Sequence, residues 1–286
     1  MSYRIILLPM DGGDADGPAL HAAFDLAKEF NSHVDALCVS AVPEDSVPLL
    51  VNGMTASAVQ EILEAAQADI DARRERTRQL FHRSMDCWRF RAAGEGAFGD
   101  GPSGAWRERS GLAEDLLPGE ARWSDLVVFA YAPDDTVHGS AIEATLVGAG
   151  RPVLMVPPDR ATPIGRFVAI AWNGSVEAAR SVVAGLPFLL RADGVAVLMA
   201  APSAPLETEG ARLTDYLAWH GIEANIVAVD PGEEHTGPVL AAKAAELGAD
   251  LIVMGAYGYS RLREYVFGGV TRHALQDAGI ARLLTH

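Results

Sequence analysis

The chain has 286 residues, of which 49% are hydrophobic, so it is long enough for two domains with a core each and too apolar to be disordered. Its 23 basic and 38 acidic residues give a formal net charge of −15, which repels nucleic acid phosphates and anionic membrane surfaces. We therefore expect neither nucleic acid nor membrane as a partner.

Short apolar runs alternate with helical periodicity along the chain. In the first half this pattern predicts strands at 3–9, 34–42, 87–93, 125–131 and 152–156, and helices at 17–30, 57–84, 104–117 and 140–149. In the second half it predicts strands at 166–172, 194–200, 223–229, 250–255 and 281–285, and helices at 176–190, 209–220, 236–247 and 269–278. Such alternation is typical of parallel sheets with helices on both faces.

The two halves repeat each other. Three pairs of segments occur in the same order in both: Asp11-Gly12 and Asn173-Gly174, Ser124-Asp125 and Ala249-Asp250, and Gly139-Ser140 and Gly268-Gly269. We therefore predict an α/β protein of two tandem doubly wound domains, each with a five-stranded, mainly parallel sheet. A proline-rich linker separates them, giving domains 1–158 and 163–286. The extra length of the first copy is assigned to a long amphipathic helix within 42–83, whose arginine-rich face is interpreted as solvated.

Ligands of open α/β sheets bind beyond the carboxyl ends of the strands. In the second copy one such end carries Met254-Gly255-Ala-Tyr-Gly258, and nine residues later Gly268-Gly269-Val270-Thr271 opens a predicted helix. Glycines let the backbone approach an anion closely, and the N–H groups at a helix start attract negative charge. The Thr271 hydroxyl is a further donor at the same place. This loop therefore favours phosphate binding.

The glycine spacing resembles G-x2-G-x9-G-(S/T) of the universal stress protein family, here in tandem form. The resemblance implies the fold of the adenine nucleotide α hydrolases and a role in stress response or signalling. A cytoplasmic location is expected because the sequence shows no signal-peptide pattern, no membrane-spanning run and no disulfide framework. It implies binding of ATP or another adenine nucleotide, with or without Mg²⁺. It places Asn173 near the ribose and three residues near the adenine. The implied binding residues are Ala171, Trp172, Asn173, Ala200, Met254, Gly255, Gly258, Gly268, Gly269, Val270 and Thr271.

The first copy lacks this loop, since Ala130 and Pro133 stand in place of Gly255 and Gly258 and the following spacing is four residues shorter. One ligand site per chain is expected, in the second copy. By resemblance, the copies pair through 152–156 and 281–285 as an intramolecular pseudo-dimer, within a homo-oligomer.

Two other functions stay open. An interaction module that binds no nucleotide is favoured by Gly269 in place of Ser or Thr, by Asn173 in place of Asp, and by the bulk of Trp172. An adenylating ligase would need a pyrophosphate loop after the first strand, and Asn173-Gly174-Ser175 is a short version of one.

Other motifs give no catalytic or metal site. The chain has no G-K-(S/T), no G-x-S-x-G and no H-x-x-x-H, so we expect at most slow ATP hydrolysis. Gly94 to Gly99 has the G-x-G-x-x-G spacing, but more Gly and Pro follow, so we predict a flexible loop through Gly104. Cys38 and Cys87 are interpreted as lone thiols. The N-terminus does not resemble a signal peptide, and no apolar run reaches membrane-spanning length.

Overall fold

The computed structural model describes residues 2–42, 55–92, 101–130, 136–158, 163–200, 204–230, 232, 236–256 and 279–286. The first copy contains β1 (Ile5–Met10), α1 (Asp16–Phe30), β2 (His33–Ser40), α3 (Ala56–Trp88), β3 (Arg91–Ala92), β4 (Ser103–Ser110), α4 (Ala113–Ala121), β5 (Leu126–Ala130), α5 (Thr136–Gly148) and β6 (Val153–Val156). The second contains β7 (Phe167–Ala171), α6 (Val176–Leu189), β8 (Gly194–Ala200), α7 (Ala204–Trp219), β9 (Asn225–Val229), α8 (Thr236–Glu246), β10 (Leu251–Gly255) and β11 (Ala281–Thr285).

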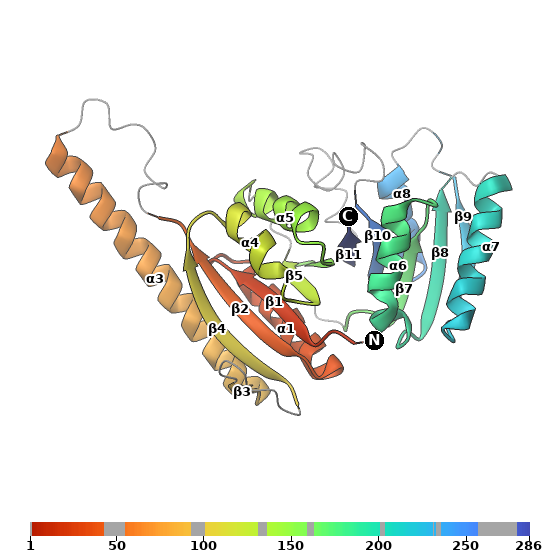
Figure 1. The fold of residues 1–286 in the computed structure, drawn as a ribbon, viewed down its shortest axis with the longest axis horizontal. Coiled ribbons are helices and arrows are strands. Elements are labelled where there is room, and N and C mark those ends of the chain that lie inside the picture. Colours follow the sequence, from red (N-terminus) through yellow and green to blue (C-terminus); the bar gives the residue numbers. More distant parts are fainter. Residues whose placement is uncertain are drawn as a thin grey trace.

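All these strands belong to one sheet of 11 strands, in the order β3-β4-β2-β1-β5-β6-β11-β10-β7-β8-β9 (Figure 1). Within each copy every paired strand is parallel to its neighbour. The order β4-β2-β1-β5-β6 in the first copy repeats as β9-β8-β7-β10-β11 in the second. The predicted fold, two tandem doubly wound α/β units with parallel strands, is confirmed.

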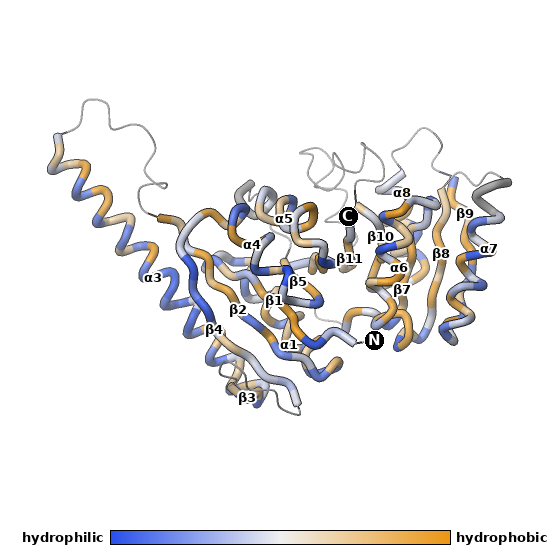
Figure 2. Tube along the Cα trace, viewed as in Figure 1, coloured by the Kyte–Doolittle hydropathy of each residue, from blue (hydrophilic) through white to orange (hydrophobic). Residues whose placement is uncertain are grey.

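Helices cover both faces of the sheet and form a core on each. On one face α1, α3, α6 and α7 pack against the strands, and on the other α4, α5 and α8 do so. Every residue of β5 and β11 is buried, as expected for strands covered on both faces. Figure 2 shows hydrophobic residues along much of strand β8, whereas α3 alternates hydrophobic and hydrophilic positions.

The largest departure from the sequence prediction concerns the third strand of the first copy. The predicted strand 87–93 is wrong, because α3 continues to Trp88 with Phe81 and Met85 buried on the same helix face. Only two residues, Arg91 and Ala92, form β3 there.

The third strand is β4, within the segment predicted as the helix 104–117 and partly within the predicted loop. It pairs with β2 over eight residues, and Arg107 donates to both carboxylate oxygens of Asp35 on β2, at 2.8 and 2.6 Å. This long-range ladder overrides the local helical pattern. The helix begins only at Ala113, after Gly111 with a φ of +141°.

The long helix predicted in the first copy is α3, and it accounts for 17 residues of that copy's extra length. It has 33 residues, whereas its counterpart α7 has 16. Its buried residues are Thr77, Phe81 and Met85, near its C-terminal end, and the N-terminal half extends beyond the sheet (Figure 1). No helix in the described part of the chain is long and apolar enough to cross a membrane.

The copies meet at an antiparallel pair of strands, as expected from the resemblance. Leu154 of β6 stands opposite Leu283 of β11. A second contact lies beside this seam, where the Tyr3 ring packs between Phe30 of the first copy and Phe188 of the second, with ring centroids 5.3 and 5.5 Å away. The Tyr3 hydroxyl donates to the Ala184 carbonyl at 2.6 Å.

Tyr3→Phe should destabilise the fold by about 1 kcal/mol at neutral pH, because the half-buried Ala184 carbonyl loses the hydrogen bond from the Tyr3 hydroxyl. Burial, and secondarily the charge of Asp125, raise the pKa of Tyr3 above its usual range. Above about pH 10 the unfolded state releases the Tyr3 proton while the folded state keeps it. The contribution of Tyr3 to the free energy of unfolding is therefore complete below about pH 10 and is lost as the pH rises above it. Urea unfolding should show that the difference in free energy of unfolding between the wild type and Tyr3→Phe is smaller at about pH 11 than at pH 7.

Tyr216→Phe, at a residue 38% exposed, is the control and should leave stability unchanged. A constant difference between Tyr3→Phe and wild type at both pH values would contradict this account.

Deleting residues 283–286 should cause aggregation or loss of the compact form, because it strips β6 and β10 of the strand between them. Size-exclusion chromatography with light scattering measures the mass and radius. Removal of the exposed His286 alone is the matched control and should leave both unchanged. A soluble 283–286 deletion with wild-type mass and radius would show that β11 does not hold the copies together.

Candidate functional site

The candidate site lies where the second copy's chain path reverses. From β7 the chain proceeds to β8 on one side, and β10 lies on the other. Ligands of open sheets bind at such a switch point, beyond the carboxyl ends of the strands. The structure brings together the ends of β7, β8 and β10, with Ala171, Ala200 and Gly255 as their last residues. Outside the described residues lie Gly258, Gly268, Gly269, Val270 and Thr271.

The turn after β7 is shaped by Asn173. The backbone N–H of Ser175 donates to Asn173 Oδ1 at 3.0 Å, and Gly174 takes a φ of +75° that a Cβ would disfavour. Ser175 then caps α6, since its hydroxyl accepts from the Ala178 N–H at 3.1 Å. Asn173 Nδ2 has no hydrogen-bond partner in the part of the chain that the structure describes, so this amide keeps a free donor at the switch point.

The first copy makes the same turn with a carboxylate. The Gly13 N–H donates to Asp11 Oδ1 at 2.8 Å, and Gly12 has a φ of +86°. Asp and Asn therefore serve equally well as the acceptor in this turn. The two residues differ in their second polar atom: Asn173 has the Nδ2 amide donor where Asp11 has a second carboxylate oxygen, which can only accept.

Gly255 is explained by packing. A Cβ on Gly255 would lie 2.6 Å from the Ala178 nitrogen and 2.6 Å from the Glu177 carbonyl carbon. The first turn of α6 therefore sits directly on the end of β10. Thr285 adds to this contact, since its hydroxyl donates to the Glu177 carbonyl at 3.1 Å. The close approach carries the positive end of the α6 dipole to the switch point, where it favours an anion.

The predicted adenine contacts point in different directions. The backbone N–H of Trp172 donates to the Leu198 carbonyl at 2.9 Å. The Trp172 side chain packs toward α6 and α7. Ala171 packs on the opposite core, and Met254, 7% exposed, is buried in that core as well. Ala200 ends β8 half-buried, paired with Val229. At the switch point Trp172 and Met254 therefore offer backbone atoms rather than side chains.

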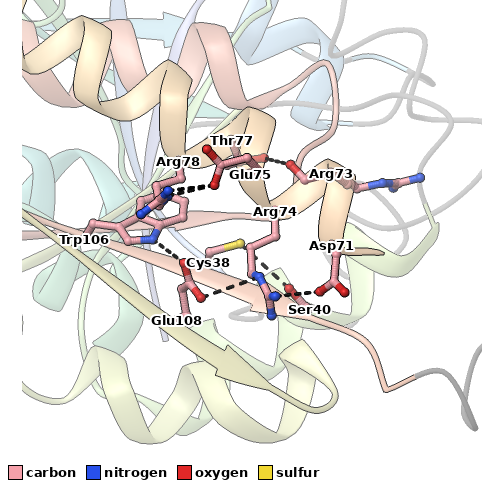
Figure 3. Close-up of polar contacts among 10 residues, drawn as sticks. All are labelled: Cys38, Ser40, Asp71, Arg73, Arg74, Glu75, Thr77, Arg78, Trp106 and Glu108. Atoms are coloured by element: carbon pink, nitrogen blue, oxygen red, sulfur yellow. Dashed lines mark hydrogen bonds and ion pairs between the residues drawn. The ribbon is translucent and has the colours of Figure 1, made fainter. Parts of the chain in front are cut away.

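In the first copy, α3 covers the corresponding turn. A Cβ on Gly12 would overlap Arg73 Cγ and come within 2.9 Å of Thr77 Oγ1. Neighbouring charges fix the helix there, as Figure 3 shows: Arg74 pairs with Asp71 on α3 and with Glu108 of β4, the latter at 3.6 Å. Two side chains of α3, Arg73 and Thr77, thus cover the turn in the first copy, whereas one side chain of α7, Glu209, lies against the equivalent Gly174 turn in the second.

Cys38 lies at the end of β2 under this cover, with its sulfur 3.9 Å from the Ser40 hydroxyl (Figure 3). Burial raises the pKa of Cys38 to about 11, so the thiol stays protonated at neutral pH and is a poor nucleophile. Both cysteines are free. Among the described residues, no three His, Cys, Asp or Glu side chains gather as a metal site.

Sequence reasoning missed two charged residues next to the switch point, Glu209 and Arg212 of α7. Glu209 reaches the turn after β7, since its Oε2 lies 2.7 Å from where a Cβ of Gly174 would be. Their spacing of three marks one helix face, but only the packing of α7 beside α6 brings that face to the site.

The family model for the universal stress protein family matches residues 2–86 and 188–285. No curated protein matches the sequence. Among solved structures, a universal stress protein from Archaeoglobus fulgidus DSM 4304 superposes with a TM-score of 0.65 at 13% identity, covering 98% of this chain and 95% of that one. A putative universal stress protein from Pseudomonas aeruginosa UCBPP-PA14 gives 0.52 at 19% identity, covering 99% and 93%. The cytoplasmic domain of a prokaryotic cation chloride cotransporter gives 0.51 at 13% identity, covering 98% and 94%.

At these identities the structural matches establish the fold, which is the one that the internal repeat predicted. The family match lies in both halves of the chain and includes β1, β10 and β11. With the repeated strand order and the antiparallel seam, these findings show that the chain belongs to the universal stress protein family, in a tandem two-copy form.

Proposed function

We propose that the second copy binds an adenine nucleotide, ATP, ADP or AMP, at the switch point between β7 and β10, and that the chain acts in stress response or signalling in the cytoplasm. The observation that carries the proposal is the first turn of α6 seated on Gly255, beside the Asn173 turn. This arrangement puts a helix N-terminus and a free amide donor at the point where the G-x2-G-x9-G segment leaves the sheet.

Each proposed contact follows from chemistry. Asn173 Nδ2 donates to a ribose oxygen, and the ends of β7 and β8, at Ala171, Trp172 and Ala200, border the base. The phosphates face Gly255, Gly258 and the N–H groups of residues 268–271, with the Thr271 hydroxyl as a further donor. A Mg²⁺ ion would bind through the phosphate oxygens, since it favours oxygen ligands and retains waters.

Two described carboxylates lie near this edge, Glu177 and Glu209, and neither side chain is oriented by a hydrogen bond within the described chain. We therefore propose binding and signalling in place of efficient hydrolysis, which needs a positioned general base. The exposed Glu108 and the acid Glu120 belong to β4 and α4 of the first copy, on the other side of the seam. The first copy is proposed to support the second structurally, because Arg73 and Thr77 fill the space over its own turn.

A second candidate is an interaction module without a nucleotide. Glu177, in the first turn of α6, favours it, because a carboxylate there partly offsets the helix dipole that would attract phosphate. Titration with nucleotide separates the two functions.

Calorimetric titration with ATP should give one site per chain. Gly258→Val should abolish binding while leaving the circular dichroism spectrum unchanged, because a branched side chain crowds the phosphate path. Asn173→Ala should weaken binding about ten-fold through the loss of one donor.

Asp11→Asn, in the equivalent turn of the first copy, is the matched control and should bind ATP as the wild type does. Two equal sites would contradict the assignment to the second copy. No binding, or normal binding by Gly258→Val, would exclude the nucleotide proposal in this form.

A further inference from the structure

A hollow lies between α6 and α7 of the second copy, and its lining begins at Trp172 and Gly174, beside the turn after β7. Its volume is about 420 Å³, within the range of small-molecule sites. Val182 of α6 and Leu213 of α7 form apolar walls, and the rings of Trp172 and Tyr216 contribute to its lining. We call it the α6–α7 groove.

The fold does not require this groove. In the first copy the corresponding helices, α1 and α3, are packed together by aromatic side chains. The Phe24 ring lies 5.9 Å from Phe81 and 6.1 Å from Trp88, and both phenylalanines are buried. In the second copy a space remains between α6 and α7, with Val182 and Leu213 in its walls.

The Trp172 indole forms part of the groove wall. Its Nε1 atom is inaccessible to solvent and has no hydrogen bond to any residue that the structure describes. Because a ligand in the groove cannot reach an inaccessible atom, Trp172 contributes the surface of its ring to the lining and not a hydrogen-bond donor.

Two opposite charges complete the lining. Glu209 and Arg212 stand three apart on α7, a spacing that allows an ion pair, yet neither makes a hydrogen bond or ion pair within the described chain. The groove therefore presents one anion, one cation and apolar walls.

We infer that the α6–α7 groove binds a free α-amino acid with an apolar side chain. The ammonium group pairs with Glu209, and the carboxylate pairs with Arg212. The side chain lies against Val182 and Leu213. A simple carboxylic acid leaves Glu209 without a counter-charge, and a simple amine leaves Arg212 without an acceptor. The ligand is electrically neutral, so the net charge of −15 does not oppose its binding.

The indole N–H signals of the five tryptophans provide a direct readout by two-dimensional NMR. Trp172→Phe identifies the Trp172 signal by its disappearance. Adding L-phenylalanine to the wild type should move this signal while leaving that of Trp219, 91% exposed, in place. Phenethylamine, without the carboxylate, and 3-phenylpropionate, without the ammonium, should each bind at least about ten-fold more weakly.

Glu209→Gln and Arg212→Gln should each weaken phenylalanine binding about ten-fold, because each removes one charged partner. Glu223→Gln, at an exposed residue outside the groove, is the matched control and should bind normally. Gly258→Val should also bind phenylalanine normally, so loss of the nucleotide site and loss of the groove site are distinguishable. An unmoved Trp172 signal at about 10 mM phenylalanine, or equal binding of the single-charge probes, would overturn the inference.

Discussion

The antiparallel pairing of β6 with β11 determines how the two copies form one protein. Each copy ends in a short, fully buried strand that would otherwise be an exposed apolar edge. Pairing Leu154 with Leu283 removes both edges and joins the sheets into one of 11 strands. Because the strands run in opposite directions at this seam, the carboxyl ends of β6 and β11 lie at its opposite ends. Each switch point is therefore built from the residues of one copy, and the copies were free to diverge.

Their divergence is clearest in the helix that follows the second strand. In the first copy this helix is α3, whose Arg73 and Thr77 close over the Gly12 turn and whose aromatic residues fill the space beside α1. In the second copy it is the shorter α7, which leaves a hollow beside α6 and brings Glu209 near the Gly174 turn. The first copy thus has tightly packed side chains between α1 and α3, whereas the second copy has a hollow between α6 and α7 that is lined in part by the charged residues Glu209 and Arg212. A difference in one helix accounts for both changes.

The sequence predicted the elements whose signal is local and missed those that depend on distant partners. Strands β7 and β10 are short apolar runs, and both were predicted nearly to the residue. Strand β4 contains Arg107 and Glu108, and only its ladder with β2 makes it a strand. Gly255 was recognised, but its close contact with Ala178 could not be, because it joins residues more than 70 positions apart. The inward direction of Trp172 likewise depends on α6 and α7 together.

The fold alone does not determine what such a chain binds, since the same architecture occurs in a cotransporter's cytoplasmic domain. Function depends on local groups that act against an overall charge of −15. For an anionic nucleotide, the α6 terminus and nearby N–H groups must outweigh this long-range repulsion, which salt screens. A zwitterion in the α6–α7 groove meets no net repulsion and needs only matched charges within a few ångströms. The two sites therefore respond differently to ionic strength, because one is governed by the field of the whole chain and the other by two neighbouring charged side chains, Glu209 and Arg212.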